Sequence, residues 1–158
     1  MPLTHSASGR TSASGGKSVN PVFIYQGEIM DSYHFSHISE QNLRGVHSDL
    51  VKVVRLALRL SQIDFRVIEG MRNMARQRQL VSSGKSQTLN SRHLTGHAVD
   101  LAPWVNHSIP WQDWDAFVLI AKAMKKAAAQ SEIPLVWGGD WKTLKDGPHF
   151  ELTREKYP

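Results

Sequence analysis

Apolar positions follow a helical period in two segments of this chain. From Ser48 to Gln62 they recur every three or four residues, and the basic side chains fall largely between them. This pattern predicts a helix with Ser48 as its N-cap. The same period predicts a longer helix over residues 113–132. The two apolar faces comprise Leu50, Val53, Val54, Ala57 and Leu58, and Phe117, Ile120, Ala121, Met124 and Ala128.

Shorter segments show the alternation that is typical of strands. Residues 65–70 alternate and end in glycine, and "HAVDLAPW" is closed by Pro103. The segments "PLVWGGDW" and "PHFEL" are two further strand candidates, and a polar helix is expected over 73–81, ended near Gly84. This order of elements predicts an α+β fold: a single compact domain with a small antiparallel sheet flanked by helices.

The N-terminal segment differs in composition from the rest of the chain. Residues 1–20 are rich in Ser, Gly and Thr and contain almost no large apolar side chains, so they cannot offset their ordering entropy by burial. We expect residues 1–29 to be a flexible or added leader, within which "PVFIYQGEI" could form a short strand, and residues 30–158 to be the folded domain. The segment lacks the apolar core of a signal peptide.

Composition narrows the classes of function. The chain has 158 residues, of which 41% are apolar, which suffices for one domain with a real core. The absence of cysteine excludes disulfides, thiolate zinc sites and a cysteine nucleophile, but leaves His/Asp metal sites open. The formal charge of +5 is compatible with an anionic partner or simply with a basic surface. No apolar run approaches the roughly 18 residues of a membrane span, and we expect no membrane insertion.

The stretch "SRHLTGHAVD" contains a histidine and an acid that could share a metal ion. Gly96 would allow a tight turn, so that His93 could fold back toward Asp100 on the following strand. Imidazole and carboxylate are both good Zn²⁺ ligands, and His149 in "PHFE" is the best candidate for a third ligand. Taken alone the pair is a weak signal. A loop histidine and a strand-end aspartate are then the favoured interpretation.

A second acid strengthens the metal hypothesis. Asp146 lies three residues before His149 in "DGPH", where a Gly-Pro turn could bring its carboxylate to the same place. A zinc hydrolase needs such a carboxylate, outside the ligand set, to accept a proton from water. The alternative is that Asp146 merely begins a turn.

These residues also carry a resemblance to a known family. "SRHLTGHAVD" matches the S-x-H-x-x-G-x-A-x-D signature of the M15 peptidases, and "DGPHFEL" resembles their acid-x-x-His element. The family includes D-alanyl-D-alanine carboxypeptidases, vancomycin-resistance dipeptidases and phage L-alanyl-D-glutamate endopeptidases. The dipeptidases usually have Glu as the acid of this element. This sequence has Asp there and in this respect resembles the phage endolysin branch. The resemblance extends over about residues 35–152.

The resemblance implies roles for individual residues. His93, Asp100 and His149 would bind zinc, and Asp146 would be the catalytic base. Arg72, in "EGMR", falls where the family has an arginine beside the metal, which would stabilise an oxyanion or hold a substrate carboxylate; alternatively it is a surface residue that begins a helix.

Three further kinds of residue near the signature are candidates for a role. Ser91 would donate to substrate or shape its loop. His97 occupies a variable position of the signature, and alternation turns it away from the ligand face. The tryptophans could line a substrate groove, but aromatic side chains more often pack in the core.

The expected function follows from this resemblance. It implies an M15/hedgehog-like metallopeptidase fold and a monomeric zinc endopeptidase that cuts the L-alanyl-D-glutamate bond of peptidoglycan during bacterial host lysis. The protein would be made in the host cytoplasm without a signal peptide and would reach the wall through a pore made by another protein. The alternatives are a D-alanyl-D-alanine carboxypeptidase or dipeptidase, or a non-catalytic zinc-containing wall-binding module. No recognisable nucleic-acid-reading motif accompanies the basic charge.

Overall fold

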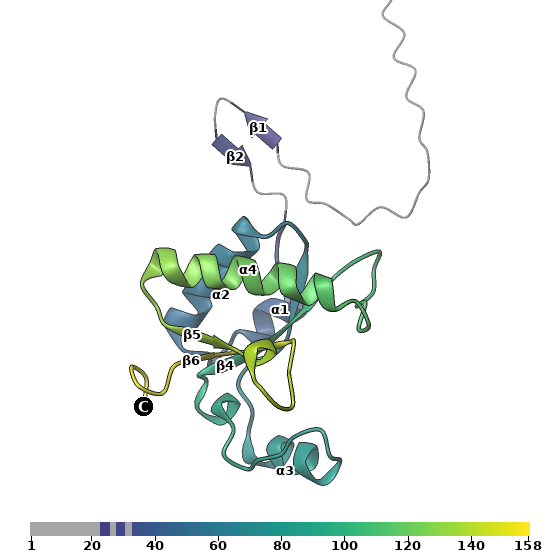
Figure 1. The fold of residues 1–158 in the computed structure, drawn as a ribbon, viewed down its shortest axis with the longest axis vertical. Coiled ribbons are helices and arrows are strands. Elements are labelled where there is room, and N and C mark those ends of the chain that lie inside the picture. The colour runs from purple at the N-terminus through teal and green to yellow at the C-terminus, as the bar shows by residue number, and fades with distance from the viewer. Residues whose placement is uncertain (1–22, 26–27, 31–32) are drawn as a thin grey trace, which may run out of the picture.

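The computed structural model describes residues 23–25, 28–30 and 33–158 of the chain (Figure 1). Most of the expected leader, including residues 1–22, lies outside the described residues. Within "PVFIYQGEI" the structure has two short antiparallel strands, β1 (Phe23–Tyr25) and β2 (Glu28–Met30), which form a sheet of their own.

The two helices predicted from the apolar period and the polar helix predicted over residues 73–81 are present. They are α2 (Ser48–Leu60), α3 (Met74–Ser82) and α4 (Trp114–Ser131). Three short elements were not expected, because they are too short to show a period: α1 (His37–Asn42) and the 3₁₀ helices η1 (Arg92–Thr95) and η2 (Gly138–Asp140). Among the described residues, no helix combines the length and the apolarity needed to cross a membrane.

The main sheet has four antiparallel strands in the order β3-β4-β6-β5. Their bounds are β3 (Phe65–Glu69), β4 (Ala98–Pro103), β5 (Leu135–Trp137) and β6 (His149–Leu152). The register pairs Asp100 with His149 on one side of β4. On the other side, an irregularity between Val67 and Glu69 places Glu69 opposite Asp100.

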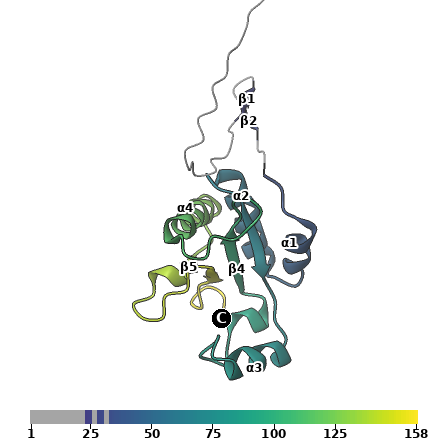
Figure 2. The same ribbon diagram turned by 90° about the vertical axis from the view of Figure 1, so that its right-hand side faces the viewer.

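The two faces of this sheet have different chemistry. Val99 and Leu101 of β4 and Phe150 of β6 are fully buried in a core shared with α2 and α4, which pack against each other (Figure 1). Because successive side chains of a strand point to opposite faces, Asp100 and His149 lie together on the other face. Helix α3 lies at the end of the domain away from α4 in both views (Figures 1 and 2). The core therefore fixes the strands that carry the polar residues.

Several predicted boundaries need correction. The N-cap of α2 is His47, not Ser48: its Nδ1 accepts a hydrogen bond from the Asp49 N–H at 3.1 Å, and its own N–H donates to the Gly96 carbonyl at 2.8 Å. A ring nitrogen thus replaces the expected hydroxyl because His47 is held in place by a segment distant in sequence. In "PLVWGGDW" the strand ends at Trp137, and the two glycines begin η2.

Candidate active site

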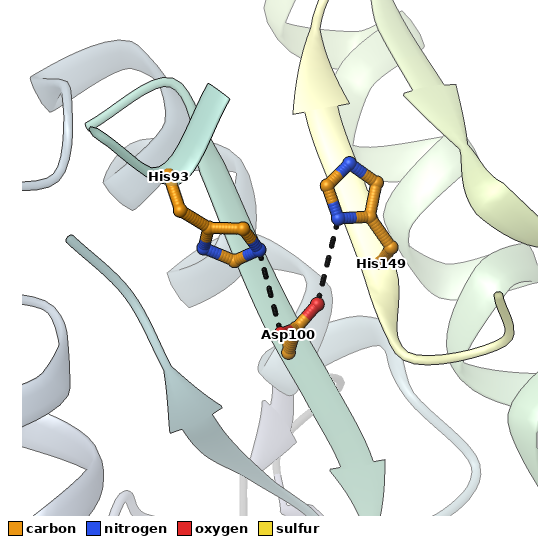
Figure 3. A group of neighbouring side chains, drawn as sticks. All are labelled: His93, Asp100 and His149. Carbon is orange, nitrogen blue, oxygen red and sulfur yellow. Dashed lines mark ion pairs between the residues drawn. The ribbon is translucent and has the colours of Figure 1, made fainter. Parts of the chain in front are cut away.

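The side chains of the three predicted ligands converge on one point at the polar face of the sheet (Figure 3). His93 comes from η1, Asp100 from β4 and His149 from the start of β6. His93 Nε2 lies 3.4 Å from Asp100 Oδ2, and His149 Nδ1 lies 3.5 Å from Asp100 Oδ1. One ligand atom from each residue lies within 4.8 Å of the others, an arrangement that can hold a metal ion.

Each histidine is oriented by a hydrogen bond at its other ring nitrogen. His93 Nδ1 lies 2.8 Å from the carbonyl oxygen of Gly70, and His149 Nε2 lies 2.7 Å from Glu151 Oε2. Because both partners can only accept, these nitrogens carry the protons. In the neutral imidazoles the bare nitrogens are His93 Nε2 and His149 Nδ1, the two that face Asp100, and metal-ligating histidines are held in this way.

The atoms that face one another are poorly satisfied without a cation. His93 Nε2 and Asp100 Oδ1 are buried and have no hydrogen-bond partner. Buried polar atoms of this kind are rare unless an ion or a water completes them. A divalent cation between these three residues would satisfy both atoms, so the donor set fits a metal.

The charges of the site also favour a cation. Burial alone would raise the pKa of the Asp100 carboxyl, but the imidazoles of His149 and His93 hold it well below its usual range. Burial would lower the pKa of His149, yet its hydrogen bonds to Asp100 and Glu151 raise it to about 9. In the metal-free site Asp100 is therefore ionised and His149 holds a proton, which a bound metal would displace.

Arg72 lies at the edge of this site and contacts the candidate ligand Asp100 directly. Its Nη2 donates to Asp100 Oδ2 at 3.1 Å and to Glu69 Oε2 at 2.9 Å, and its side chain is 10% exposed. The backbone N–H of Arg72 also donates to the His93 carbonyl at 2.9 Å. These contacts hold together two of the segments that carry candidate ligands, and they engage Nη2 with protein carboxylates.

A buried glutamine extends this network to the neighbouring loop. Gln77 of α3 is fully buried, and its Oε1 accepts from Arg72 Nη1 at 3.2 Å. Its Nε2 donates to Ser86 Oγ at 2.9 Å and to the Thr88 carbonyl at 2.7 Å. Gln77 thus connects Asp100, through Arg72, to the loop that follows α3.

Asp146 lines the same groove as His93 and His149 and lies outside the group of candidate ligands. Its backbone N–H donates to the Gly138 carbonyl at 3.0 Å, and its carbonyl accepts from the His149 N–H at 3.3 Å. Burial and the charge of Asp100 raise the pKa of the Asp146 carboxyl, against the opposing effect of His149, His93 and Arg72. A partly buried carboxylate with a raised pKa beside a candidate metal site is suited to proton transfer.

The site opens into a groove of about 860 Å³. Segments 85–92 and 141–146 line it, with the buried His93 and His149 at its base. The Trp141 ring lies 5.1 Å from the His149 ring, and Trp141 is the one tryptophan of the five that lines this groove. Of the others, Trp137 is core, whereas Trp111 and Trp114 are exposed.

The remaining predicted residues have identifiable places. Ser91 Oγ accepts from the His93 N–H at 3.3 Å as the N-cap of η1, and Ser91 also lines the groove. His97 is outside the ligand group, 2.7 Å from Thr95 Oγ1. Glu151 and Gln77 were not identified from the sequence. The alternation His-x-Glu in β6 was a usable signal for Glu151, since it places both side chains on one face; no local signal indicates Gln77.

Comparison with known proteins adds independent information. Residues 31–155 match the family described as phage L-alanyl-D-glutamate peptidase. The L-alanyl-D-glutamate peptidase of Escherichia phage T5 is 38% identical over 129 residues, which cover 80% of this chain and 93% of that protein. The peptidoglycan L-alanyl-D-glutamate endopeptidase CwlK of Bacillus subtilis is 32% identical over 111 residues, covering 57% of this chain and 61% of CwlK. The crystal structure of the Serratia marcescens L-Ala D-Glu endopeptidase ChiX superposes with a TM-score of 0.74 at 57% identity, covering 78% of this chain and 92% of ChiX.

Proposed function

Because this chain belongs to the phage L-alanyl-D-glutamate peptidase family, we propose that it is a zinc endopeptidase which hydrolyses the L-alanyl-D-glutamate bond of the peptidoglycan stem peptide. A peptidoglycan-cleaving endopeptidase of the M15 type accords with the relatives and with the fold. The observation that carries the proposal is the convergence of three buried ligand atoms, two of them without a hydrogen-bond partner, at the base of an open groove.

The donor set supports zinc as the metal. Two imidazole nitrogens and one carboxylate oxygen, from His93, His149 and Asp100, are ligands that Zn²⁺ prefers. Three protein ligands leave a coordination position free, as in catalytic rather than structural sites. When bound there, zinc supplies Lewis-acid chemistry, which polarises a carbonyl group and increases the acidity of water.

Asp146 would carry the proton in this reaction. Its raised pKa suits a group that accepts a proton from the attacking water and then releases it to the leaving nitrogen of D-glutamate. The amide C–N bond breaks, the alanine carbonyl carbon gains the water oxygen as a carboxylate, and D-glutamate leaves as an amine. Asp146 ends each turnover as it began, ionised.

For Arg72 and Ser91, the observed contacts favour support of the site over direct binding of substrate. The contacts of Arg72 with Asp100 and Glu69 favour holding a ligand in place over binding a substrate carboxylate. The hydrogen bond from the His93 N–H to Ser91 favours shaping of η1. We propose that both residues act on the site through His93 and Asp100.

The cellular context remains part of the proposal. The protein would act as a monomer on the bacterial wall, reach it from the host cytoplasm through a pore made by another protein, and cause host lysis. Its basic net charge of +5 would favour encounter with a polyanionic wall at low salt.

The decisive experiment is digestion of purified peptidoglycan by the wild type and by Asp146→Asn, with bound zinc quantified and the fragments identified by mass spectrometry. We expect new L-alanine C-termini and D-glutamate N-termini from the wild type, and a loss of at least about 100-fold in rate with zinc retained in the variant. Asp140→Asn is the matched control, because Asp140 is exposed and pairs with Lys125 away from the groove.

The outcomes separate the alternatives. Release of terminal D-alanine instead of internal cleavage would indicate a carboxypeptidase. Zinc in both proteins without cleavage by either would indicate a binding module. Absence of zinc from both would contradict the metal site.

A further inference from the structure

Three lysines line the groove: Lys85 in the loop after α3, and Lys142 and Lys145 in the segment before Asp146. Lys142 and Lys145 are exposed, line the groove, and form no ion pair or hydrogen bond with any residue that the structure describes. They lie in the segment that ends at Asp146. Of the two acids that line the groove, Glu151 is paired with His149, and Asp146 directly follows Lys145 in the chain; Asp100, at the candidate metal site, is paired with Arg72. The cationic charge of this segment is therefore available to a bound molecule.

The leaving group of the proposed reaction carries a matching charge. In the stem peptide the chain continues through the γ-carboxyl of D-glutamate, so its α-carboxylate stays free. The carbon that bears this carboxylate is bonded directly to the scissile nitrogen. Asp146 must lie close to this nitrogen to protonate it, so its carboxylate also lies near the negatively charged α-carboxylate of D-glutamate. A nearby cation would offset that repulsion.

From this juxtaposition, and resting on the proposed function, we propose that Lys142 and Lys145 form a subsite for the free α-carboxylate of the residue on the leaving side of the scissile bond. The enzyme would thereby distinguish a D-glutamate carboxylate from the corresponding amide. Ammonium groups are suited to this task because each donates charge-assisted hydrogen bonds to a carboxylate.

The backbone between the two lysines supports a functional loop. Leu144 has a φ of +50°, in the left-handed region that a branched side chain rarely adopts, and it is 71% exposed. No burial of its side chain compensates for this conformation. Unfavourable backbone conformations that persist at the rim of a site are typical of loops whose shape serves binding.

The test uses two soluble stem peptides that contain the L-alanyl-D-glutamate bond and differ only in the α-carboxyl of D-glutamate, free in one and amidated in the other. Cleavage is measured with the zinc-loaded wild type and with Lys142→Gln/Lys145→Gln. We expect the wild type to prefer the free carboxylate by about tenfold in kcat/KM, mainly through KM, and the double variant to lose this preference. Cleavage of the amidated peptide should change little.

Two further variants make the result specific. Lys122→Gln/Lys126→Gln removes the same charge from exposed positions of α4 outside the groove, and it should retain the preference. Lys142→Arg/Lys145→Arg keeps the charge and should also retain it. The preference should shrink as salt is raised.

Equal kcat/KM for the two peptides in the wild type, or an undiminished preference in Lys142→Gln/Lys145→Gln, would overturn this inference alone. A wild type that cleaves neither peptide would overturn the proposed function and the subsite with it. Because both lysines are exposed, an unchanged melting temperature is expected for every lysine variant.

Discussion

His149 Nε2 lies 2.7 Å from Glu151 Oε2, and this contact determines which ring nitrogen of His149 faces Asp100. In the neutral imidazole the proton is placed on Nε2, so that Nδ1 is the nitrogen that can bind a metal once it has lost its own proton. The two residues alternate with the core residue Phe150 along β6. One short strand therefore carries a candidate ligand, its orienting carboxylate and a core side chain.

Replacement of Glu151 by Gln should weaken metal binding about tenfold, because a neutral amide orients and polarises the imidazole less well than a carboxylate. The measurement is metal affinity by competition with a chelator. Glu155→Gln is the matched control, since Glu155 is exposed and outside the groove. A lower melting temperature with unchanged affinity would reduce Glu151 to a structural role.

Replacement of Arg72 by Lys should reduce kcat/KM by about tenfold or more while a metal still binds. A single ammonium group cannot reproduce the contacts of Arg72 with Asp100, Glu69 and Gln77, so the ligand carboxylate loses its fixed orientation. Steady-state kinetics and metal content are measured together. Arg76→Lys, which also alters a contact with Glu69 but at a side chain that is 46% exposed, should have little effect. Equal losses in the two variants would contradict the special role of Arg72.

Metal affinity should rise with pH up to about 9, because the pKa of His149 in the metal-free site is raised to about 9. Below that value His149 holds a proton that the metal must displace, so affinity should fall by about tenfold for each pH unit. Calorimetry at pH 7 in buffers of different ionisation enthalpy should detect release of about one proton per metal bound. Binding without proton release would show that His149 is not a ligand.

Replacement of Gly138 by Ala should impair both the base and a ligand. An added Cβ would collide with the Asp146 carbonyl oxygen and lie 3.0 Å from the Cβ atoms of Asp146 and His149. We expect a loss of activity of about 100-fold, because small displacements of catalytic groups are costly. Gly84→Ala offers a contrast: its Cβ meets nothing within 4 Å, but its φ is +76°, so it should cost about 1 kcal/mol of stability and leave activity intact. Kinetics and thermal unfolding distinguish the two effects.

Local patterns in the sequence predicted the fold class and indicated the candidate ligands, whose roles were implied by the family resemblance. The apolar period predicted α2 and α4, because burial of one face imposes the spacing of a helix on the sequence. Alternation placed Asp100 on the face opposite Val99, and the "DGPH" segment placed Asp146 next to His149. Each of these inferences uses residues within a few positions of one another.

The tertiary structure decided what depends on distant segments. An irregularity in β3 places Glu69 opposite Asp100, and Arg72, three residues after Glu69, contacts both carboxylates. From α3, Gln77 contacts both Arg72 and the loop at Thr88. His47 caps α2 because Gly96 holds it there. The sequence by itself determined which residue types could bind a metal and transfer a proton, since those are properties of side chains. Their orientation, charge state and supporting contacts depend on strand register and loop packing, which no local period encodes.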